Sequence, residues 1–297
     1  MSKSKTYNLQ AVKTYSKWED YTMLIKLRLS LVVVATSILG YMIAAGTVIY
    51  WREMLLLAIG GMLVTAAANT LNQVLEKDYD KLMQRTMDRP LAAGRMKVSE
   101  AVMFAGMTCL FGVSILAIFN PITALLGMLS FITYAFIYTP LKRFTTMSVA
   151  IGAVPGALPV LIGFTAFTGS ISYVAIALFA IQFLWQFPHF WAIGYLAFDD
   201  YNGAGYKLLP TKNGKIDPSL GLHAAIYGMM IIPFAWMAYV FGGISMIGLV
   251  LTIVMTIVYS IMGLHMYRQQ DRKSALLLMF TSFFYMPLVL VAFYLWP

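Results

Sequence analysis

Amide and acidic side chains recur at a fixed interval near the end of the second apolar segment of the chain. Asn72, Glu76 and Asp80 are spaced four residues apart. On a helix, each would lie about 40° around the axis from the one before, on a single face. Asp78 would point to nearly the opposite face. Oxygen-bearing side chains that converge at a membrane edge suit a hard divalent cation, so the pattern predicts a metal site at this helix end.

Basic side chains follow these acids and recur in a later polar loop. The first set is Lys81, Arg85 and Arg89, and the second is Lys142 with Arg143. Bases at a membrane edge orient helices in any case. They can also bind diphosphate oxygens, arginine as a planar fork and lysine as a point charge. Bases for phosphate beside acids for metal predict diphosphate chemistry at a membrane surface.

A second acidic patch, Asp199 with Asp200, ends a later apolar segment. Taken alone, it is typical of a solvated turn at the end of a helix. Beside the first patch, it indicates a second Mg²⁺ that a substrate diphosphate would bridge to the first. Mg²⁺ usually binds through one or two carboxylates together with substrate phosphates.

The composition indicates a polytopic membrane protein. Of 297 residues, 60% are hydrophobic and 11% are charged, whereas a soluble domain has about 25% charged residues. Segments of about 20 apolar residues can cross the hydrocarbon core, and their lack of alternation favours helices over a barrel. The predicted spans are 30–49, 53–75, 100–119, 121–139, 147–168, 171–196, 220–241, 244–264 and 275–296. We therefore expect an all-α bundle of nine transmembrane helices, with an N-terminal segment at 1–27 and one membrane domain at 28–297.

The net charge of +9 is distributed unevenly across these spans. With nine spans, Arg52 is the one exception among 21 lysines and arginines that otherwise fall on a single side. The positive-inside rule assigns that side to the cytoplasm. The basic residues thus report topology and attraction to anionic lipid, and they do not indicate nucleic-acid binding. We expect a cytoplasmic N-terminus and a cytoplasm-facing active site in a bacterial inner membrane.

These motifs resemble the UbiA superfamily of intramembrane prenyltransferases. The first signature corresponds to Asn72-x-x-x-Glu76-x-Asp78-x-Asp80 followed by Arg85-Thr86-x-x-Arg89-Pro90-Leu91, and the basic loop corresponds to Tyr138-Thr139-Pro140-Leu141-Lys142-Arg143. Three features resemble the haem-farnesylating branch: Asp78, the run Gln186-Phe187-Pro188-His189-Phe190-Trp191, and Asp199-Asp200-Tyr201 with Leu209-Pro210 downstream. The chain departs from the superfamily pattern at Glu76, where most members carry Asp, and at Gly203, where a further acid is usual.

The resemblance implies transfer of farnesyl from farnesyl diphosphate to a vinyl group of haem B, with addition of water, to give haem O. The implied catalytic residues are Asn72, Glu76, Asp78, Asp80, Asp199 and Asp200, all of which except Asp78 would bind Mg²⁺. The implied diphosphate-binding residues are Lys81, Arg85, Arg89, Lys142 and Arg143. Expected partners are haem B, farnesyl diphosphate, membrane lipid, and a haem A synthase or a second copy of the chain.

His189 lies ten residues before Asp199 in the same predicted helix, which places it about 15 Å deeper in the membrane. An ionisable residue at that depth is a functional candidate, and a haem could use an axial imidazole. The alternative is a neutral histidine that is hydrogen-bonded within the bundle.

Two other functions fit parts of the pattern. One is a prenyltransferase of the same superfamily that acts on a quinone precursor or a chlorin. The other is a transporter, although transporters often place polar residues near the midplane of several helices. Here the acids cluster at one mouth of the bundle, which favours an enzyme.

Overall fold

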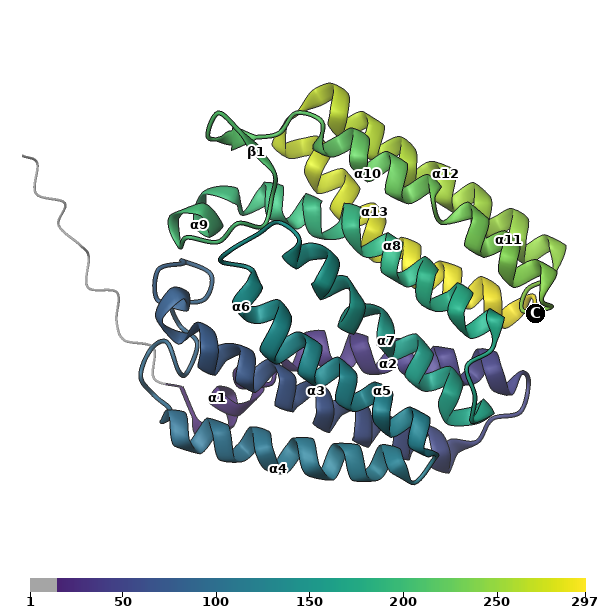
Figure 1. Ribbon diagram of the computed structural model, residues 1–297, viewed down its shortest axis with the longest axis horizontal. Helices are drawn as coiled ribbons and strands as arrows, with labels where there is room; N and C mark the ends of the chain where they lie inside the picture. Colours follow the sequence, from purple (N-terminus) through teal and green to yellow (C-terminus); the bar gives the residue numbers. More distant parts are fainter. Residues whose placement is uncertain (1–14) are drawn as a thin grey trace, which may run out of the picture.

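The structure, a computed structural model, describes residues 15–297 as a bundle of helices (Figure 1). Within that range, nine helical segments are long and apolar enough to cross a membrane, which confirms the predicted bundle. They are Leu27–Ala45 (α2), Trp51–Asp80 (α3), Val98–Ala117 (α4), Pro121–Leu141 (α5, η1 and α6), Ser148–Thr168 (α7), Tyr173–Leu196 (α8), Leu220–Val240 (α10 and α11), Met246–Gln269 (α12) and Arg272–Leu295 (α13). The lysines at 3, 5 and 13, like all of residues 1–14, lie outside the described residues.

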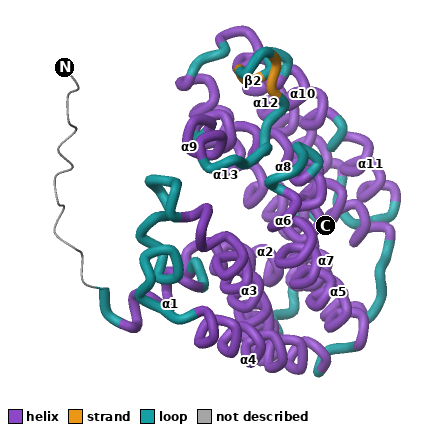
Figure 2. Tube along the Cα trace, turned by 60° about the vertical axis from the view of Figure 1, so that its left-hand side comes forward, coloured by secondary structure: helices purple, strands orange, loops and turns teal. Residues whose placement is uncertain are grey.

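Short elements gather at the left-hand end of the bundle in Figure 1, opposite the C-terminus. They are α1 (Lys17–Leu24), α9 (Phe198–Gly203) and a small antiparallel hairpin of β1 (Thr211–Lys212) and β2 (Lys215–Ile216). Figure 2 shows how little of the described chain is strand. Helix α1 falls within the predicted N-terminal segment and packs against α2 and α3. The larger connections therefore collect at one end, as the charge distribution suggested.

Helix α7 is the most buried of the nine spans and packs against α2, α5 and α8. Its contact with α2 depends on small residues. A Cβ added to Gly163 would collide with the backbone carbonyl of Ser37, and one added to Gly40 would collide with that of Val160. Lipid supplies no hydrophobic drive for helices to associate, so close backbone approach of this kind holds membrane helices together.

Two spans are interrupted where proline removes a backbone donor. The span that begins at Pro121 runs as α5 to Ile132, widens into a π-helix (η1, Thr133–Tyr138) and ends as α6 (Thr139–Leu141), which contains Pro140. Near Pro233, the span 220–240 divides into α10 (Leu220–Met229) and α11 (Ile232–Val240). Proline has no backbone N–H and cannot donate a helical hydrogen bond. Short π-helical segments within α-helices are frequent at functional sites. The sequence predicts each of them as one span, at 121–139 and 220–241, and Pro233 inside the second is expected to kink it.

The α2–α7 contact yields a stability prediction. We expect Gly163→Ala to lower stability by about 1–3 kcal/mol, because the added methyl group overpacks a backbone contact that cannot move aside. Gly106→Ala is the matched control, since a Cβ there meets no atom within 4 Å. Thermal unfolding in detergent measures both variants. Equal midpoints for the two variants would contradict the assigned packing.

Candidate active site

A buried polar cluster lies at the end of the bundle that carries the larger connections. Helix α3 supplies Asn72, Glu76 and Asp80, which are 1%, 3% and 1% exposed. The helix stays regular through Asp80, so the spacing of four keeps all three side chains on the inner face. The other members are Lys26, Arg89, Thr139 and Lys142. We call these seven residues the polar cluster.

Asn72 is fixed by three partners. Its Nδ2 donates to Oε2 of Glu76 at 2.9 Å and to the hydroxyl of Thr139 at 3.0 Å. The Thr139 hydroxyl in turn donates to the carbonyl of Tyr134, at the start of the π-helix, at 2.8 Å. Because both amide hydrogens are used, Oδ1 of Asn72 faces the cation Lys26, whose Nζ lies 2.7 Å away.

Each buried carboxylate is paired with a cation. Glu76 is in an ion pair with Lys142, whose side chain is 11% exposed. In Asp80, both carboxylate oxygens lie 2.8 Å from NH1 of Arg89. Thr86 donates to the backbone carbonyl of Asp80 at 3.0 Å, which ties the following loop back to the end of α3. Of the five cations predicted for diphosphate, Arg89 and Lys142 thus enter the polar cluster.

Lys26 joins the cluster from the turn between α1 and α2. Its ammonium lies near Asn72 and 3.4 Å from the hydroxyl of Tyr134. Burial lowers the pKa of Lys26, and the nearby Arg89 and Lys142 lower it further, while Glu76 opposes them. From the sequence alone, Lys26 is one of several bases that orient the first helix. Nothing in its local sequence separates it from the other N-terminal lysines, because its role depends on a contact with a residue 46 positions away.

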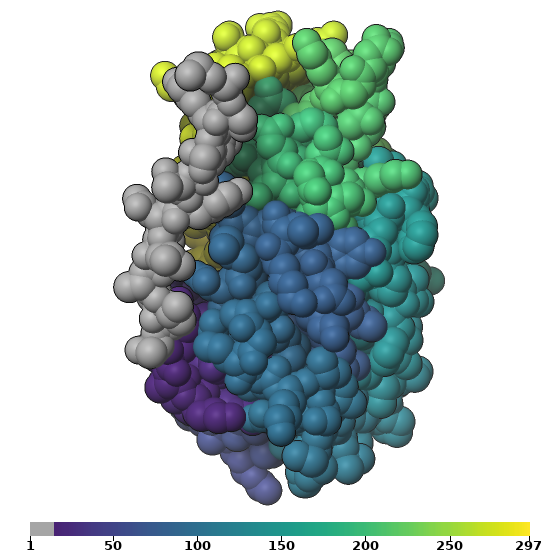
Figure 3. Space-filling model, turned by 90° about the vertical axis from the view of Figure 1, so that its left-hand side faces the viewer, coloured from purple at the N-terminus to yellow at the C-terminus, as the bar shows by residue number. Residues whose placement is uncertain are grey.

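A tyrosine from the 197–219 connection lies against the polar cluster. Tyr206 is buried, and its ring centroid lies 5.4 Å from Nζ of Lys142 and 5.7 Å from the ring of Tyr79. Burial and the neighbouring Glu76 carboxylate raise the pKa of Tyr206. Figure 3 shows the face on which the 81–97 connection, in blue, lies beside the 197–219 connection, in green. These two connections, which we call the cover, therefore lie side by side, and each follows a helix that ends near one of the two predicted acidic patches.

Three other predicted cations lie outside the polar cluster. Lys81 pairs with Asp78 at 2.8 Å on the exposed surface, where the Asp78 side chain is 66% exposed. Arg85 donates to the Tyr201 hydroxyl at 2.9 Å. Arg143 donates to the carbonyl of Leu75 at 2.7 Å and stacks on a tyrosine ring of α3. The unbroken helix leaves Asp78 facing away from Asn72, and its catalytic role stays a prediction.

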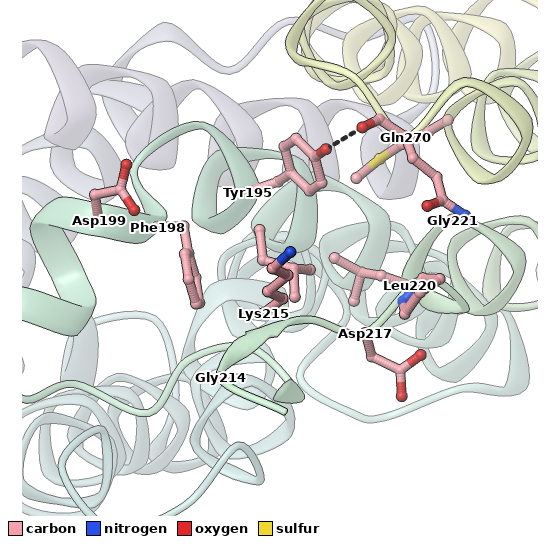
Figure 4. Close-up of a pocket in the computed structure, with 12 residues that line it drawn as sticks. Tyr195, Phe198, Asp199, Gly214, Lys215, Asp217, Leu220, Gly221 and Gln270 are labelled. Atoms are coloured by element: carbon pink, nitrogen blue, oxygen red, sulfur yellow. Dashed lines mark hydrogen bonds between the residues drawn. The ribbon is translucent and has the colours of Figure 1, made fainter. Parts of the chain in front are cut away.

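The second acidic pair is divided between two surroundings. Asp200 accepts a hydrogen bond from the backbone N–H of Gln84 at 3.3 Å, in the connection after α3. Asp199 lies at the edge of a cavity of about 410 Å³ that is also lined by Lys215 and Asp217 (Figure 4). No member of the polar cluster lines this cavity. The predicted second metal position stays a prediction.

The polar cluster has the chemistry to share a divalent ion with a substrate. Its donors are the oxygens of Asn72, Glu76 and Asp80, which Mg²⁺ prefers. Among residues 15–297, no three His, Cys, Asp or Glu side chains lie close enough together to hold a metal by themselves. Such an ion would therefore need further oxygens, and the cations Lys142 and Arg89 are placed to attract an anionic substrate that brings them.

His189 lies on α8 within the membrane-spanning bundle, away from the polar cluster. Its ring stacks on Trp185 with 4.9 Å between centroids and meets Phe283 edge-on at 5.3 Å. Its Nδ1 lies 2.7 Å from the hydroxyl of Ser282, which itself donates to the carbonyl of Met279. A serine hydroxyl has one proton, so His189 must donate from Nδ1, and Nε2 keeps its lone pair.

Comparison with known proteins agrees with this architecture. The model of the UbiA prenyltransferase family matches residues 33–286. A protoheme IX farnesyltransferase from Cytophaga hutchinsonii is 39% identical over 281 residues, which are 94% of this chain and 98% of the relative. One from Christiangramia forsetii is 39% identical over 99% of this chain and 97% of its own length.

Solved structures share the fold at lower identity. The structure of a digeranylgeranylglyceryl phosphate synthase aligns with a TM-score of 0.78 and 18% identity, over 94% of this chain and 98% of its own. A UbiA homologue from Archaeoglobus fulgidus, bound to DMAPP and Mg²⁺, aligns with a TM-score of 0.69 and 16% identity, over 92% of this chain and 99% of its own. The match of the family model over most of the chain and the relatives at 39% identity show that the chain belongs to the UbiA prenyltransferase family.

Proposed function

We propose that this protein transfers the farnesyl group of farnesyl diphosphate to a vinyl group of haem B, giving haem O and diphosphate. The observation that carries the proposal is the buried polar cluster at one end of an apolar bundle, in a chain 39% identical to a protoheme IX farnesyltransferase. In the reaction, the bond from C1 of farnesyl to oxygen breaks, and its electron pair leaves with diphosphate. C1 bonds to the terminal vinyl carbon, hydroxide from water adds to the inner vinyl carbon, and one proton is released.

The head group is bound by an exchange of ionic partners. In the structure, Lys142 lies against Glu76 and Arg89 lies against Asp80. On binding, the two cations turn to diphosphate oxygens, and Lys26 adds a third positive charge from the opposite side of Asn72. Fixed cations at the point where negative charge develops on the leaving group lower the barrier, because they need no reorganisation during the reaction.

The carboxylates that the exchange releases are then free to bind Mg²⁺. Asn72, Glu76 and Asp80 would hold the ion, which would supply Lewis-acid stabilisation of the departing diphosphate. The homologue from Archaeoglobus fulgidus was solved with Mg²⁺ and a prenyl diphosphate, DMAPP. We assign Asp199 and Asp200 to a second ion and Asp78, Lys81, Arg85 and Arg143 to outer contacts of the head group, on the basis of the sequence motifs alone.

Aromatic side chains and the cover protect the allylic cation. The ring centroid of Tyr138 lies 4.8 Å from Nζ of Lys142, so the ring lies near the proposed point of ionisation and could stabilise the cation there. Tyr206 closes the polar side of the cluster and limits the entry of bulk water. One water must still reach the vinyl carbon, so Tyr206 and the neighbouring rings would limit the access of water and would not exclude it.

We assign His189 to the haem. The bond from its Nδ1 to Ser282 fixes the tautomer in which Nε2 can coordinate iron, as outer hydrogen bonds to ligating histidines commonly do. The rings of Trp185 and Phe283 flank the imidazole with apolar surface, which suits contact with a porphyrin. The ordinary alternative, a structural histidine, predicts that Nε2 has no role.

The charge distribution also assigns a side to the reaction. The polar cluster lies at the end of the bundle with the larger, basic connections, and the positive-inside rule places such segments in the cytoplasm. We therefore propose a bacterial inner-membrane enzyme that takes farnesyl diphosphate from the cytoplasm. A haem A synthase and a second copy of the chain remain proposed partners.

Membrane vesicles test function and sidedness together. Inside-out vesicles that contain the protein, supplied with haem B, Mg²⁺ and farnesyl diphosphate, should form haem with the mass of one added farnesyl and one water. Right-side-out vesicles should form little, because the charged diphosphate does not cross the bilayer. If an added quinone precursor or chlorin is farnesylated while haem stays unchanged, that compound is the acceptor and haem is not. Uptake of labelled farnesyl diphosphate without any product would support a transporter instead.

Asp80→Asn tests the polar cluster while it keeps the size of the side chain. We expect turnover to fall by roughly a hundredfold or more, because the variant weakens charge stabilisation of the leaving group. Asp88→Asn, an exposed change in the connection that follows α3, should act like the unmodified protein. Single-turnover rates with excess Mg²⁺ measure both variants, and haem titration checks that the bundle is intact. Normal turnover of Asp80→Asn would remove Asp80 from the mechanism.

His189→Ala tests the assignment of the haem. We expect weaker haem binding and a shifted Soret band, since the iron loses an imidazole nitrogen. Ser282→Ala should weaken binding by about 10–100-fold or less, because it removes only the outer hydrogen bond. The matched control is His223→Ala, at an exposed histidine near the start of α10. If His189→Ala binds haem with an unchanged spectrum and affinity, His189 is structural.

A further inference from the structure

The turn between α1 and α2 is held by the side chain of Gln73, which is fully buried on α3. Its Nε2 donates to the carbonyl of Met23 at 2.9 Å and to that of Leu24 at 3.0 Å. Its Oε1 has no hydrogen-bond partner among the described residues. A buried acceptor without a partner is unfavourable. The oxygen therefore does not hold the amide in place, and the two bonds from Nε2 to the carbonyls of the turn determine its orientation.

Asn69, one helical turn earlier on α3, continues the same contact. Its Nδ2 donates to the carbonyl of Ile25 and to the Ser30 hydroxyl, each at 3.1 Å. The Ser30 hydroxyl also donates to the carbonyl of Ile25, at 2.7 Å. Three successive carbonyls, at 23, 24 and 25, therefore accept side-chain hydrogen bonds from α3.

This arrangement has a consequence for the next residue, Lys26. Its backbone has φ 50° and ψ 55°, in the left-handed region that residues with a Cβ rarely adopt. Such a conformation persists only where the surroundings enforce it, and these conformations cluster at functional sites. From this backbone position, the ammonium of Lys26 reaches Oδ1 of Asn72, the residue adjacent to Gln73. One turn of α3 thus holds both the backbone that precedes the lysine and the charged end of its side chain.

We propose that Gln73 and Asn69 are positioning residues, which hold the 23–26 turn so that Lys26 presents its ammonium to the diphosphate of the prenyl substrate. The inference rests on the proposed function for the identity of that anion. Neither amide touches the substrate. Their chemistry also limits what can replace them, since an ionised carboxylate has no proton to donate to a carbonyl.

A double-mutant cycle on farnesyl diphosphate binding tests the proposal. The probe is farnesyl diphosphate with Mg²⁺, titrated into the detergent-solubilised full chain by calorimetry without haem. Lys26→Met should raise the dissociation constant about tenfold or more, as expected for a lost hydrogen bond to a charged group. Gln73→Met should raise it by several-fold. In the Lys26→Met background, Gln73→Met should add less than about twofold, because the residue through which it acts is gone.

A matched control is available in α8. Gln182 is also buried, donates to a carbonyl of a neighbouring helix, that of Gly156, at 2.9 Å, and has an Oε1 without a partner among the described residues. Gln182→Met should therefore leave the dissociation constant unchanged, even if it lowers the unfolding midpoint. Asn69→Ala provides a second variant if Gln73→Met does not fold, with the same coupling to Lys26→Met expected.

The outcomes separate this inference from the proposed function. Independent effects of Gln73→Met and Lys26→Met, which multiply in the double variant, would show that Gln73 does not act through Lys26. An unchanged affinity in Lys26→Met would overturn the inference because the lysine would have no diphosphate to hold. Neither result depends on the acceptor, so failure to farnesylate haem would affect only the proposed function.

Discussion

Charge pairing in a buried space is the constraint on which the functional end of this protein depends. Glu76 and Asp80 lie almost without solvent exposure, and each is in contact with one cation. Removing one partner from such a pair typically costs about 3–5 kcal/mol, because the remaining charge is left without compensation in a medium of low polarity. The carboxylates can therefore become metal ligands only if their cations receive another anion at the same time.

The local irregularities of the fold place the cations that this pairing needs. The connection after α3 folds back so that Arg89 returns to Asp80, which ended the helix nine residues earlier. The π-helix before Pro140 presents Thr139 to Asn72, and Lys142 follows it one turn later. The left-handed turn brings in Lys26. These three departures from regular helix therefore lie at the polar cluster.

The sequence predicted the scaffold and one face of the site, because both depend on local periodicity. Apolar length determined the nine spans, and a spacing of four residues determined that Asn72, Glu76 and Asp80 share a face while Asp78 does not. The choice among cations was not predictable in this way. Arg85 and Arg89 are the same residue type in the same connection, yet only Arg89 reaches Asp80. Lys26 and Tyr206 reach the polar cluster through contacts between segments that are distant in the sequence. Local sequence and composition do not predict such contacts.

The balance of charge in the polar cluster determines how it must be filled. Arg89 and Lys142 pair one to one with Asp80 and Glu76, whereas Lys26 faces the neutral amide oxygen of Asn72 and has no acidic partner in the cluster. The cluster therefore attracts an anion first. A metal ion alone would strand Arg89 and Lys142, and a diphosphate alone would leave two carboxylates facing its oxygens. In the proposed reaction, metal and diphosphate together would give each of these charges an opposite partner, which would couple substrate binding to assembly of the catalytic site.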